Sequence, residues 1–154
     1  MSNLVLELRA GEMMIVNGAP IRFRTKTRLE LTARARFLFG KQIMAPSEAD
    51  SPARRIYFAL QTAYIGTDGE RESGLAAARP LIDEFQRATT SPLVADILRR
   101  ALAAAEADDC YQALKLTRRI IRHEDVILGR VPQADAVTTP PLNTVEHTAG
   151  HTAA

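Results

Sequence analysis

The chain has 154 residues, of which 46% are hydrophobic and 25% charged, and it carries a formal net charge of +2. These values are typical of a soluble globular domain that can bury a core, and they exclude a polycation. The single cysteine, Cys110, excludes an internal disulfide and a multi-cysteine metal site. No secretory signal pattern and no apolar run near the ~20 residues of a membrane span occur, so we expect a cytoplasmic protein that does not enter membranes.

Residues 3–44 have the apolar patterning of short β-strands. Leucines alternate with other residues near the start of the chain, and Asn17-Gly18 is a strong signal for a hairpin turn. The strand candidates are residues 4–8, 13–16, 21–24, 28–32 and 36–39. We therefore predict four or five antiparallel strands, arranged as a β-meander or small barrel, within residues 1–48.

Residues 21–31, with the sequence IRFRTKTRLEL, contain a row of positive charge. On an extended strand successive side chains point to opposite faces, so four cations would share one face and four apolar residues the other. A turn near residues 25–27 would shift this parity and still leave the cations in one hairpin. The cations are Arg22, Arg24, Lys26 and Arg28, and the apolar residues are Ile21, Phe23, Leu29 and Leu31.

The positive charge of the whole chain is concentrated at the same end. Residues 1–60 hold ten Lys and Arg against five Asp and Glu, a net of +5, whereas residues 61–129 hold nine against eleven, a net of −2. Seventeen of the 20 cations are arginine, which suits planar contact with phosphate or carboxylate, although a high-GC genome would have the same effect. Because adjacent like charges are unfavourable, we expect an extended polyanion such as a nucleic acid to offset them.

After residue 50 the apolar period becomes helical. Ser51-Pro52 combines an N-cap with a proline in the first turn, and Gly66 marks the end of this predicted helix. Ser91-Pro92 repeats the start signal for a later helix. The last helix is expected to start at about residue 109, with Asp108 as its cap and Gly129 after its end.

Between these helices, residues 70–88 are also predicted to be helical. Pro80 would kink this helix or start a shorter one after it. Residues 51–130 thus predict a bundle of three to four helices. Together with the N-terminal strands, they predict an α+β fold in which residues 1–130 form a single domain.

Two basic features lie in the predicted helices. Arg54 and Arg55 oppose the macrodipole at a helix N-terminus, which favours pairing with a distant carboxylate or with a bound phosphate, the carboxylate being the simpler interpretation. On the last helix, four cations share one face, which is either a solvated face or a stripe that binds a ligand. They are Lys115, Arg118, Arg119 and Arg122, with Asp125 in reach of Arg122 only and with Leu114, Ile120, Ile121 and Leu128 on the opposite, buried side.

No catalytic or metal-binding motif stands out. Glycine-rich phosphate loops, GxSxG, HExxH and paired CxxC are missing from the sequence. Cys110 and His123 are thirteen residues apart on one predicted helix, about 20 Å, so they cannot form a catalytic dyad. Residues 131–154 have few large apolar groups and are expected to be disordered, and His147 and His151 within them lack partner ligands. We therefore predict a non-enzymatic protein without a metal or cofactor.

Four segments resemble one known family. The segments GEMMIVNGAPIRF, ARFLFGKQIM, ADSPARRIYFALQTAYI and DCYQALKLTRRIIRHEDVILG are similar to FlbT, the flagellar assembly repressor family of alphaproteobacteria, over about residues 3–130. This resemblance implies post-transcriptional control, in which the protein associates with the 5′ untranslated region of flagellin mRNA and promotes its decay or blocks its translation. It also implies a link to the companion protein FlaF. Some members are thought to act positively on flagellin, so the sign of regulation stays open.

A shorter similarity concerns the first strands. LVLELRAGEMMIV is similar in pattern to the opening of CsrA, a dimeric β-protein that binds messenger leaders. CsrA-like proteins carry an Arg-Arg pair before the turn, whereas this chain has Leu8 followed by Arg9. The RNA contacts of CsrA are therefore not transferred, because a generic β-hairpin would give much of the same pattern.

The residues and the resemblance together predict an RNA-binding regulator. The alternative is a protein-binding flagellar assembly factor, which would dock FlaF or flagellin and act on flagellin expression indirectly. Because short strands leave unpaired edges, we also expect a homo-oligomer. The predicted RNA-binding residues are Arg9, Arg22, Arg24, Lys26, Arg28, Arg34, Arg36, Lys41, Arg54 and Arg55, with Lys115, Arg118, Arg119 and Arg122 as a secondary basic face.

Overall fold

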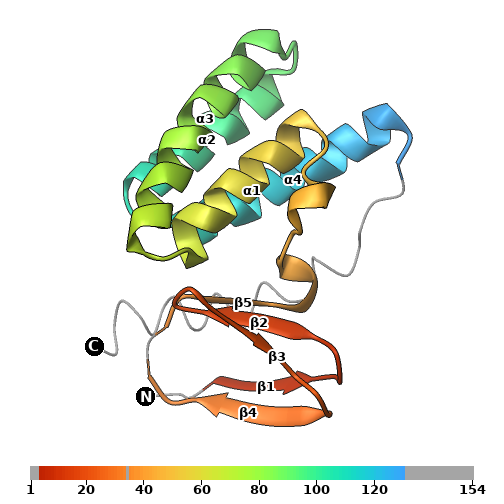
Figure 1. The fold of residues 1–154 in the computed structure, drawn as a ribbon. Coiled ribbons are helices and arrows are strands. Elements are labelled where there is room, and N and C mark those ends of the chain that lie inside the picture. Colours follow the sequence, from red (N-terminus) through yellow and green to blue (C-terminus); the bar gives the residue numbers. More distant parts are fainter. Residues whose placement is uncertain (1–3, 34, 131–154) are drawn as a thin grey trace. The chain divides into compact units, whose positions relative to one another are not determined.

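The computed structural model describes residues 4–33 and 35–130 (Figure 1). They fall into two compact units that divide between Ile43 and Met44. The first unit contains all five strands and the second all four helices of this described part, which confirms the α+β fold. Three predictions lie outside the described residues, namely those for Arg34, for His147 with His151, and for residues 131–154 as a whole.

The first unit consists of two small antiparallel sheets. One sheet pairs β1 with β4, and the other has the order β3-β2-β5. A short 3-10 helix, η1 (Gly40–Gln42), follows the last strand. The strands are β1 (Leu4–Leu8), β2 (Met13–Val16), β3 (Ala19–Arg22), β4 (Thr27–Leu31) and β5 (Phe37–Phe39).

The first four strands form one long, bent β-hairpin. Leu8 pairs with Thr27 in one sheet and Met13 pairs with Arg22 in the other, and the two residue numbers of each pair add up to 35. The same register therefore runs through both sheets from the turn at Asn17-Gly18. Both turn residues have positive φ, 49° and 87°, as the tight hairpin turn requires, which confirms the predicted turn. The hairpin bends at residues 9–12 and 23–26, where the strands of both sheets are interrupted.

The bend places the two sheets on either side of a shared apolar core. That core contains buried residues of both sheets. Of the four apolar residues between residues 21 and 31 that were predicted to share one face, three pack against this core, as expected. Ile21 differs, because it lies on the exposed outer strand β3 and is 41% exposed. The core residues are Leu4, Leu6, Leu8, Met14, Phe37 and Phe39, with Val16, Phe23, Leu29 and Leu31 packed against them.

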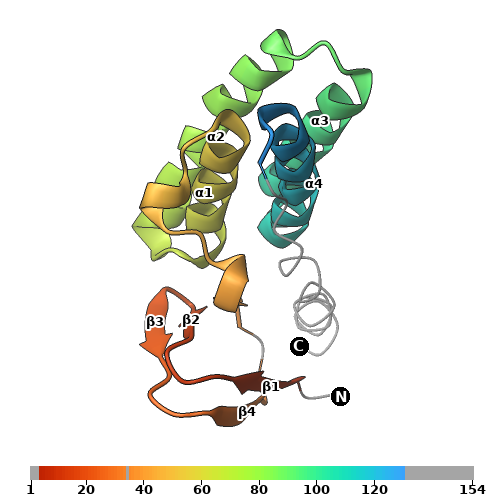
Figure 2. The ribbon, with the colours of Figure 1, turned by 90° about the vertical axis from the view of Figure 1, so that its right-hand side faces the viewer.

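The second unit is a closed four-helix bundle. α1 packs against α2 and α4, and α3 packs against the same two helices, an arrangement that Figures 1 and 2 show from two sides. Short connections make consecutive helices antiparallel. The helices are α1 (Pro52–Ile65), α2 (Asp68–Ala88), α3 (Pro92–Glu106) and α4 (Cys110–Leu128), and a short 3-10 helix, η2 (Pro46–Glu48), precedes them. No helix in the described part of the chain is long and apolar enough to cross a membrane.

Most helix ends follow the local signals in the sequence. The Ser51 hydroxyl accepts a hydrogen bond from the Arg54 amide at 3.3 Å, and Gly129 follows α4 with a left-handed φ of 71°. One expectation was wrong, and one of the two alternatives for Pro80 is excluded. Asp109, not Asp108, caps α4, because Asp108 itself takes a left-handed φ of 62°. No new helix begins after Pro80, which lies exposed inside an uninterrupted α2.

Candidate nucleic-acid interface

The bend of the hairpin gathers cations from both of its strands. The amide of Gly11 donates to the carbonyl of Phe23 at 2.6 Å, and the amide of Phe23 donates to the carbonyl of Glu12 at 2.9 Å, so the two bend segments lie side by side. Four exposed cations lie on or directly beside these segments. We call this set the bend cluster, and it consists of Arg9, Arg22, Arg24 and Lys26.

The bend cluster is not neutralised by carboxylates of the described chain. None of its four cations forms an ion pair among the residues for which the structure gives positions. Arg22 is instead held by neutral groups, since its Nη1 donates to the Gly11 carbonyl at 3.3 Å and its Nη2 contacts the Met13 sulfur at 3.4 Å. Glu12, the acid within the bend segments, accepts a hydrogen bond from the Arg9 backbone amide at 2.6 Å. The cluster can therefore present guanidinium and ammonium groups to an external anion.

Arg28 differs from the bend cluster in its surroundings. Of the two arrangements expected for the row at residues 21–31, the structure has the one with a turn, in which the cations stay in one hairpin. Arg22 lies on β3 and Arg28 on β4, while Arg24 and Lys26 lie in the bend between these strands. Arg28 lies on the outer face of β4, directly across from Glu7 and two residues before Glu30. The positive charge of Arg28 is therefore partly offset by the negative charges of acids on the same face of the sheet.

The remaining predicted residues of the first unit lie at its two ends. Arg36 exchanges hydrogen bonds with Asn17, through the Arg36 amide to Oδ1 at 2.9 Å and the Asn17 amide to the Arg36 carbonyl at 2.8 Å. It therefore lies at the hairpin turn, at the opposite end of β2 from the bend. Lys41 is exposed on η1, next to Gly40, where a Cβ would lie 3.3 Å from Oε2 of Glu12. Lys41 thus lies at the bend end of the unit.

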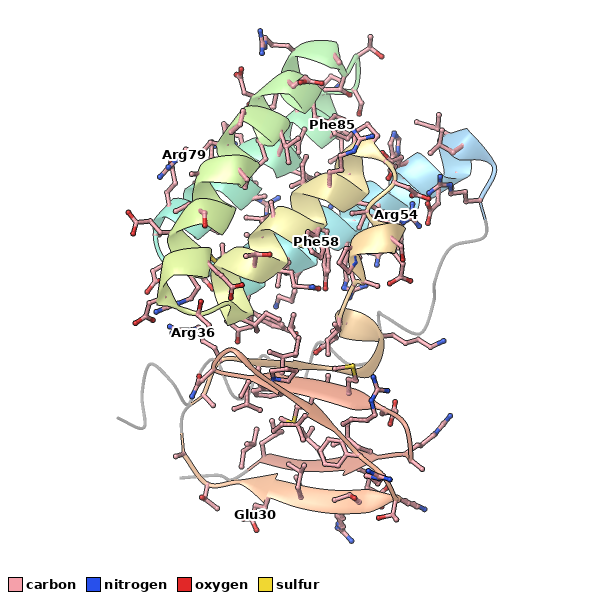
Figure 3. All side chains as sticks on the ribbon, viewed as in Figure 1. Glu30, Arg36, Arg54, Phe58, Arg79 and Phe85 are labelled. Carbon is pink, nitrogen blue, oxygen red and sulfur yellow. The ribbon has the colours of Figure 1, made fainter. Side chains whose placement is uncertain are left out.

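Arg54 belongs to a buried ion pair and not to a surface. Its Nη1 and Nη2 donate to the two carboxylate oxygens of Asp125 at 2.7 and 3.1 Å, and Oε1 of Glu124 is 3.7 Å away. Figure 3 labels Arg54 among the side chains of the helical unit. The hydrogen bonds to Asp125 raise the pKa of the Arg54 guanidinium, which stays charged. Of the two roles considered, pairing with a carboxylate is correct, and Arg54 is excluded from the RNA-binding set. Arg55 is exposed on α1.

The secondary basic face on α4 is partly engaged by tyrosines. The Arg118 guanidinium lies 4.6 Å from the centre of the Tyr57 ring and donates to the Tyr57 hydroxyl at 2.6 Å. Burial raises the pKa of that hydroxyl, so it remains protonated at neutral pH. The Lys115 ammonium lies 5.6 Å from the centre of the Tyr111 ring. Arg119 is exposed and Arg122 half-buried. The expected ion pair between Asp125 and Arg122 does not form, because the Asp125 carboxylate binds Arg54 instead.

Other candidate chemistry is weak in the described residues. Cys110 is buried, whereas His123 is exposed further along the same helix. No group of three or more histidine, cysteine, aspartate or glutamate residues in this part of the chain could hold a metal ion. Sequence reasoning missed one surface, the exposed apolar end of α4, because it placed Leu128 on the buried side of that helix. Helical periodicity shows which face is apolar, but it does not show where the covering helix ends.

Comparison with known proteins identifies the family. The family described as "Flagellar protein FlbT" matches residues 4–128. A protein of Caulobacter sp. (strain K31), named probable flagellum biosynthesis repressor protein FlbT, is 35% identical over 83% of this chain and 98% of its own length. The flagellum biosynthesis repressor protein FlbT of Caulobacter vibrioides (strain ATCC 19089 / CIP 103742 / CB 15) is 33% identical over 83% of this chain and 91% of its own.

More distant relatives carry the same name. The probable flagellum biosynthesis repressor protein FlbT of Allorhizobium ampelinum is 27% identical over 88% of this chain and 90% of its own length. No solved structure matches the chain. The matched residues reach into both structural units and include the four segments that suggested the resemblance, apart from the final Gly129. The chain therefore belongs to the FlbT family of flagellar proteins.

Proposed function

We propose that this protein represses flagellum biosynthesis after transcription, by binding the 5′ untranslated region of flagellin mRNA through the bend cluster. The observation that carries the proposal is the convergence of Arg9, Arg22, Arg24 and Lys26, which have no carboxylate partner among residues 4–33 and 35–130. The family membership supports the flagellar role, because related proteins are named flagellum biosynthesis repressors. Repression then follows from blocked translation or from decay by host ribonucleases.

The chemistry of the bend cluster suits a phosphate backbone. Arginine contacts phosphate oxygens through two parallel donors, and three of the four cations are arginines. The backbone hydrogen bonds of the bend fix the relative positions of the Cα atoms that carry these side chains. Phosphate contacts supply affinity, while sequence preference in RNA comes from unstacked bases in loops and single strands. Lys41, at the same end of the unit, extends the positive surface.

The test is a salt titration of RNA binding with purified protein and the flagellin leader transcript. Arg22→Gln, Arg24→Gln and Lys26→Gln together should weaken binding and lower the slope of log K against log salt by about 2, at roughly 0.7 per lost contact on a single strand. The matched control is Arg87→Gln with Arg99→Gln, which removes two exposed arginines of the helical unit that pair with Asp83 and Asp96. Unchanged affinity and slope in the triple variant would exclude the bend cluster.

The same binding experiment can instead support the alternative function, in which the protein binds another flagellar protein and not RNA. The partially engaged basic face of α4 favours this alternative, because Arg119 and Arg122 lack ion-pair partners among the described residues. If the purified protein does not retain RNA at about 0.15 M salt but retains FlaF or flagellin, then control of flagellin expression is indirect.

Self-association is part of the same proposal. β1 and β4 form a two-stranded sheet, so within the described chain each of them has one edge without a strand partner. Such edges readily pair between copies. We expect a dimer or a higher assembly, and light scattering at tens of micromolar that gives a monomer near the chain mass of 16.9 kDa would contradict it.

A further inference from the structure

The C-terminal end of α4 exposes three consecutive apolar side chains. Val126 and Ile127 are each 71% exposed and Leu128 is 51% exposed. Figure 1 shows this blue end of α4 projecting past α1. We call these three residues the apolar tip. Isolated exposed apolar residues are common on soluble proteins, but three in succession at one helix end mark a candidate interaction site.

The apolar tip is part of a well-formed helix end. The amide of Gly129 donates to the Val126 carbonyl at 3.2 Å, and the amide of Arg130 donates to the Asp125 carbonyl at 2.7 Å, which is the Schellman pattern. The Arg130 guanidinium also pairs with Asp50 at 3.0 Å. These bonds fix the last turn, so the three apolar side chains are presented in a defined arrangement.

The exposure of the apolar tip has a geometric cause. α1 covers the inward side of α4 up to Glu124, whose carboxylate accepts from the Ser51 hydroxyl at 2.5 Å and from the Ala53 amide at 3.0 Å. Those two residues mark the start of α1, so no part of α1 remains to cover the next turn of α4. Ile127 and Leu128 continue the buried side of α4, seven and four residues after Ile120 and Glu124, and are left without that cover.

Cations lie next to the apolar tip on the outer side of α4. Val126 follows Arg122 by four residues and Arg119 by seven, so the three share one helix face. The two acids of this turn do not neutralise these arginines, because Glu124 binds the start of α1 and Asp125 binds Arg54. Arg122 forms no ion pair with any residue in the described ranges. The surface is therefore apolar at its end and positive beside it.

We propose that the apolar tip and the adjacent Arg119 and Arg122 dock an amphipathic, acidic segment of another protein. An apolar side on that segment would cover Val126, Ile127 and Leu128, and its carboxylates would pair with the two arginines. A nucleic acid backbone would neutralise the arginines but would leave the apolar tip in water. The same surface of a second copy would bring arginines against arginines. This site lies in the helical unit and is independent of the bend cluster in the β unit.

The test begins with a photo-crosslinking amino acid at Ile127 of the full-length protein in its native host. The crosslinked segment is identified by mass spectrometry, and a synthetic peptide of that segment is titrated against the purified protein. We expect a segment with acidic and apolar residues at helical spacing. Val126→Ser with Ile127→Ser, and separately Arg119→Gln with Arg122→Gln, should each raise the Kd of the peptide at least tenfold.

The control variants change similar residues elsewhere in the helical unit. Leu93→Ser removes another exposed apolar side chain, which is 59% exposed at the start of α3, and Arg99→Gln removes an exposed arginine of α3. Both should leave the Kd of the peptide within twofold. The proposal is overturned if the crosslink joins Ile127 to residues 131–154 of the same chain, to a second copy or to RNA only. It is equally overturned if no crosslink forms, or if the peptide binds all variants alike.

Discussion

The buried pair between Arg54 and Asp125 predicts a large loss of stability when one partner is removed. The side chains of Arg54 and Asp125 are only 10% and 1% exposed, and two hydrogen bonds of 2.7 and 3.1 Å join them. Asp125→Ala would leave the Arg54 charge buried with Glu124, at 3.7 Å, as its remaining ion-pair partner among the described residues. Removing one member of a buried pair costs about 3–5 kcal/mol. Because Glu124 remains, we expect the lower end, about 3 kcal/mol.

The assay is urea unfolding followed by circular dichroism at 222 nm, which reports on the helical unit. With an m-value of about 1 kcal/mol/M for a unit of this size, the midpoint should fall by about 3 M. Replacing both partners by apolar residues, Arg54→Met with Asp125→Leu, should restore part of that loss, because the two charges are removed together, while Glu124 keeps its hydrogen bonds from Ser51 and Ala53 but loses its cation. The matched control is Asp83→Ala, which breaks an exposed pair with Arg87.

The control pair, Asp83 with Arg87, is exposed to solvent, whereas the pair of Arg54 with Asp125 is buried, so the comparison isolates the effect of burial. Arg87 and Asp83 are 73% and 63% exposed, so water already screens their attraction. An exposed i,i+4 pair contributes about 0.3–0.5 kcal/mol, and Asp83→Ala should shift the midpoint by less than about 0.5 M. A shift below about 1 M for Asp125→Ala, or a double variant that is less stable than Asp125→Ala alone, would refute the role assigned to this buried pair.

Two further predictions concern α2. Gly74→Ala should destabilise the bundle by about 1–3 kcal/mol in the same urea assay, although alanine is the better helix former, because its Cβ would lie 2.6 Å from the Ala63 amide nitrogen. Gly69→Ala, which meets nothing within 4 Å, should instead leave stability equal or slightly higher, and equal effects of the two changes would argue against the close α1–α2 crossing. A hydrogen bond from the Thr67 amide lowers the pKa of Glu70 from 4.5, so its stabilising contribution is present above that pH and is lost as the pH falls through the lowered value. The difference in Tm between parent and Glu70→Gln should therefore be largest at neutral pH and shrink as the pH falls below 4.5, and a difference that does not change with pH would contradict the capping role.

Local signals in the sequence determined much of the secondary structure. Ser51-Pro52 and Ser91-Pro92 start α1 and α3, and Gly129 follows α4, as predicted. Asn17-Gly18 forms the hairpin turn. Each of these features depends on φ preferences and hydrogen bonds within about four residues of the chain, which is why the sequence alone is sufficient.

The candidate site was only partly predictable for the opposite reason. The sequence identified Arg22, Arg24 and Lys26 as a concentration of charge, but it did not show that a bend would bring Arg9 beside them and separate them from Arg28. That arrangement depends on pairing between residues 9–12 and 23–26, which lie far apart in the sequence. The resemblance covered both units, and the family comparison confirmed it.

Tertiary structure decided which charges and apolar groups remain available. Arg54 and Asp125 are 71 residues apart, and only the antiparallel packing of α1 on α4 brings them together and removes Arg54 from the surface. The same packing ends at Glu124 and leaves the apolar tip exposed. Composition and periodicity describe what each segment can bury or bind, whereas the partner that it meets is selected by contacts between distant parts of the chain.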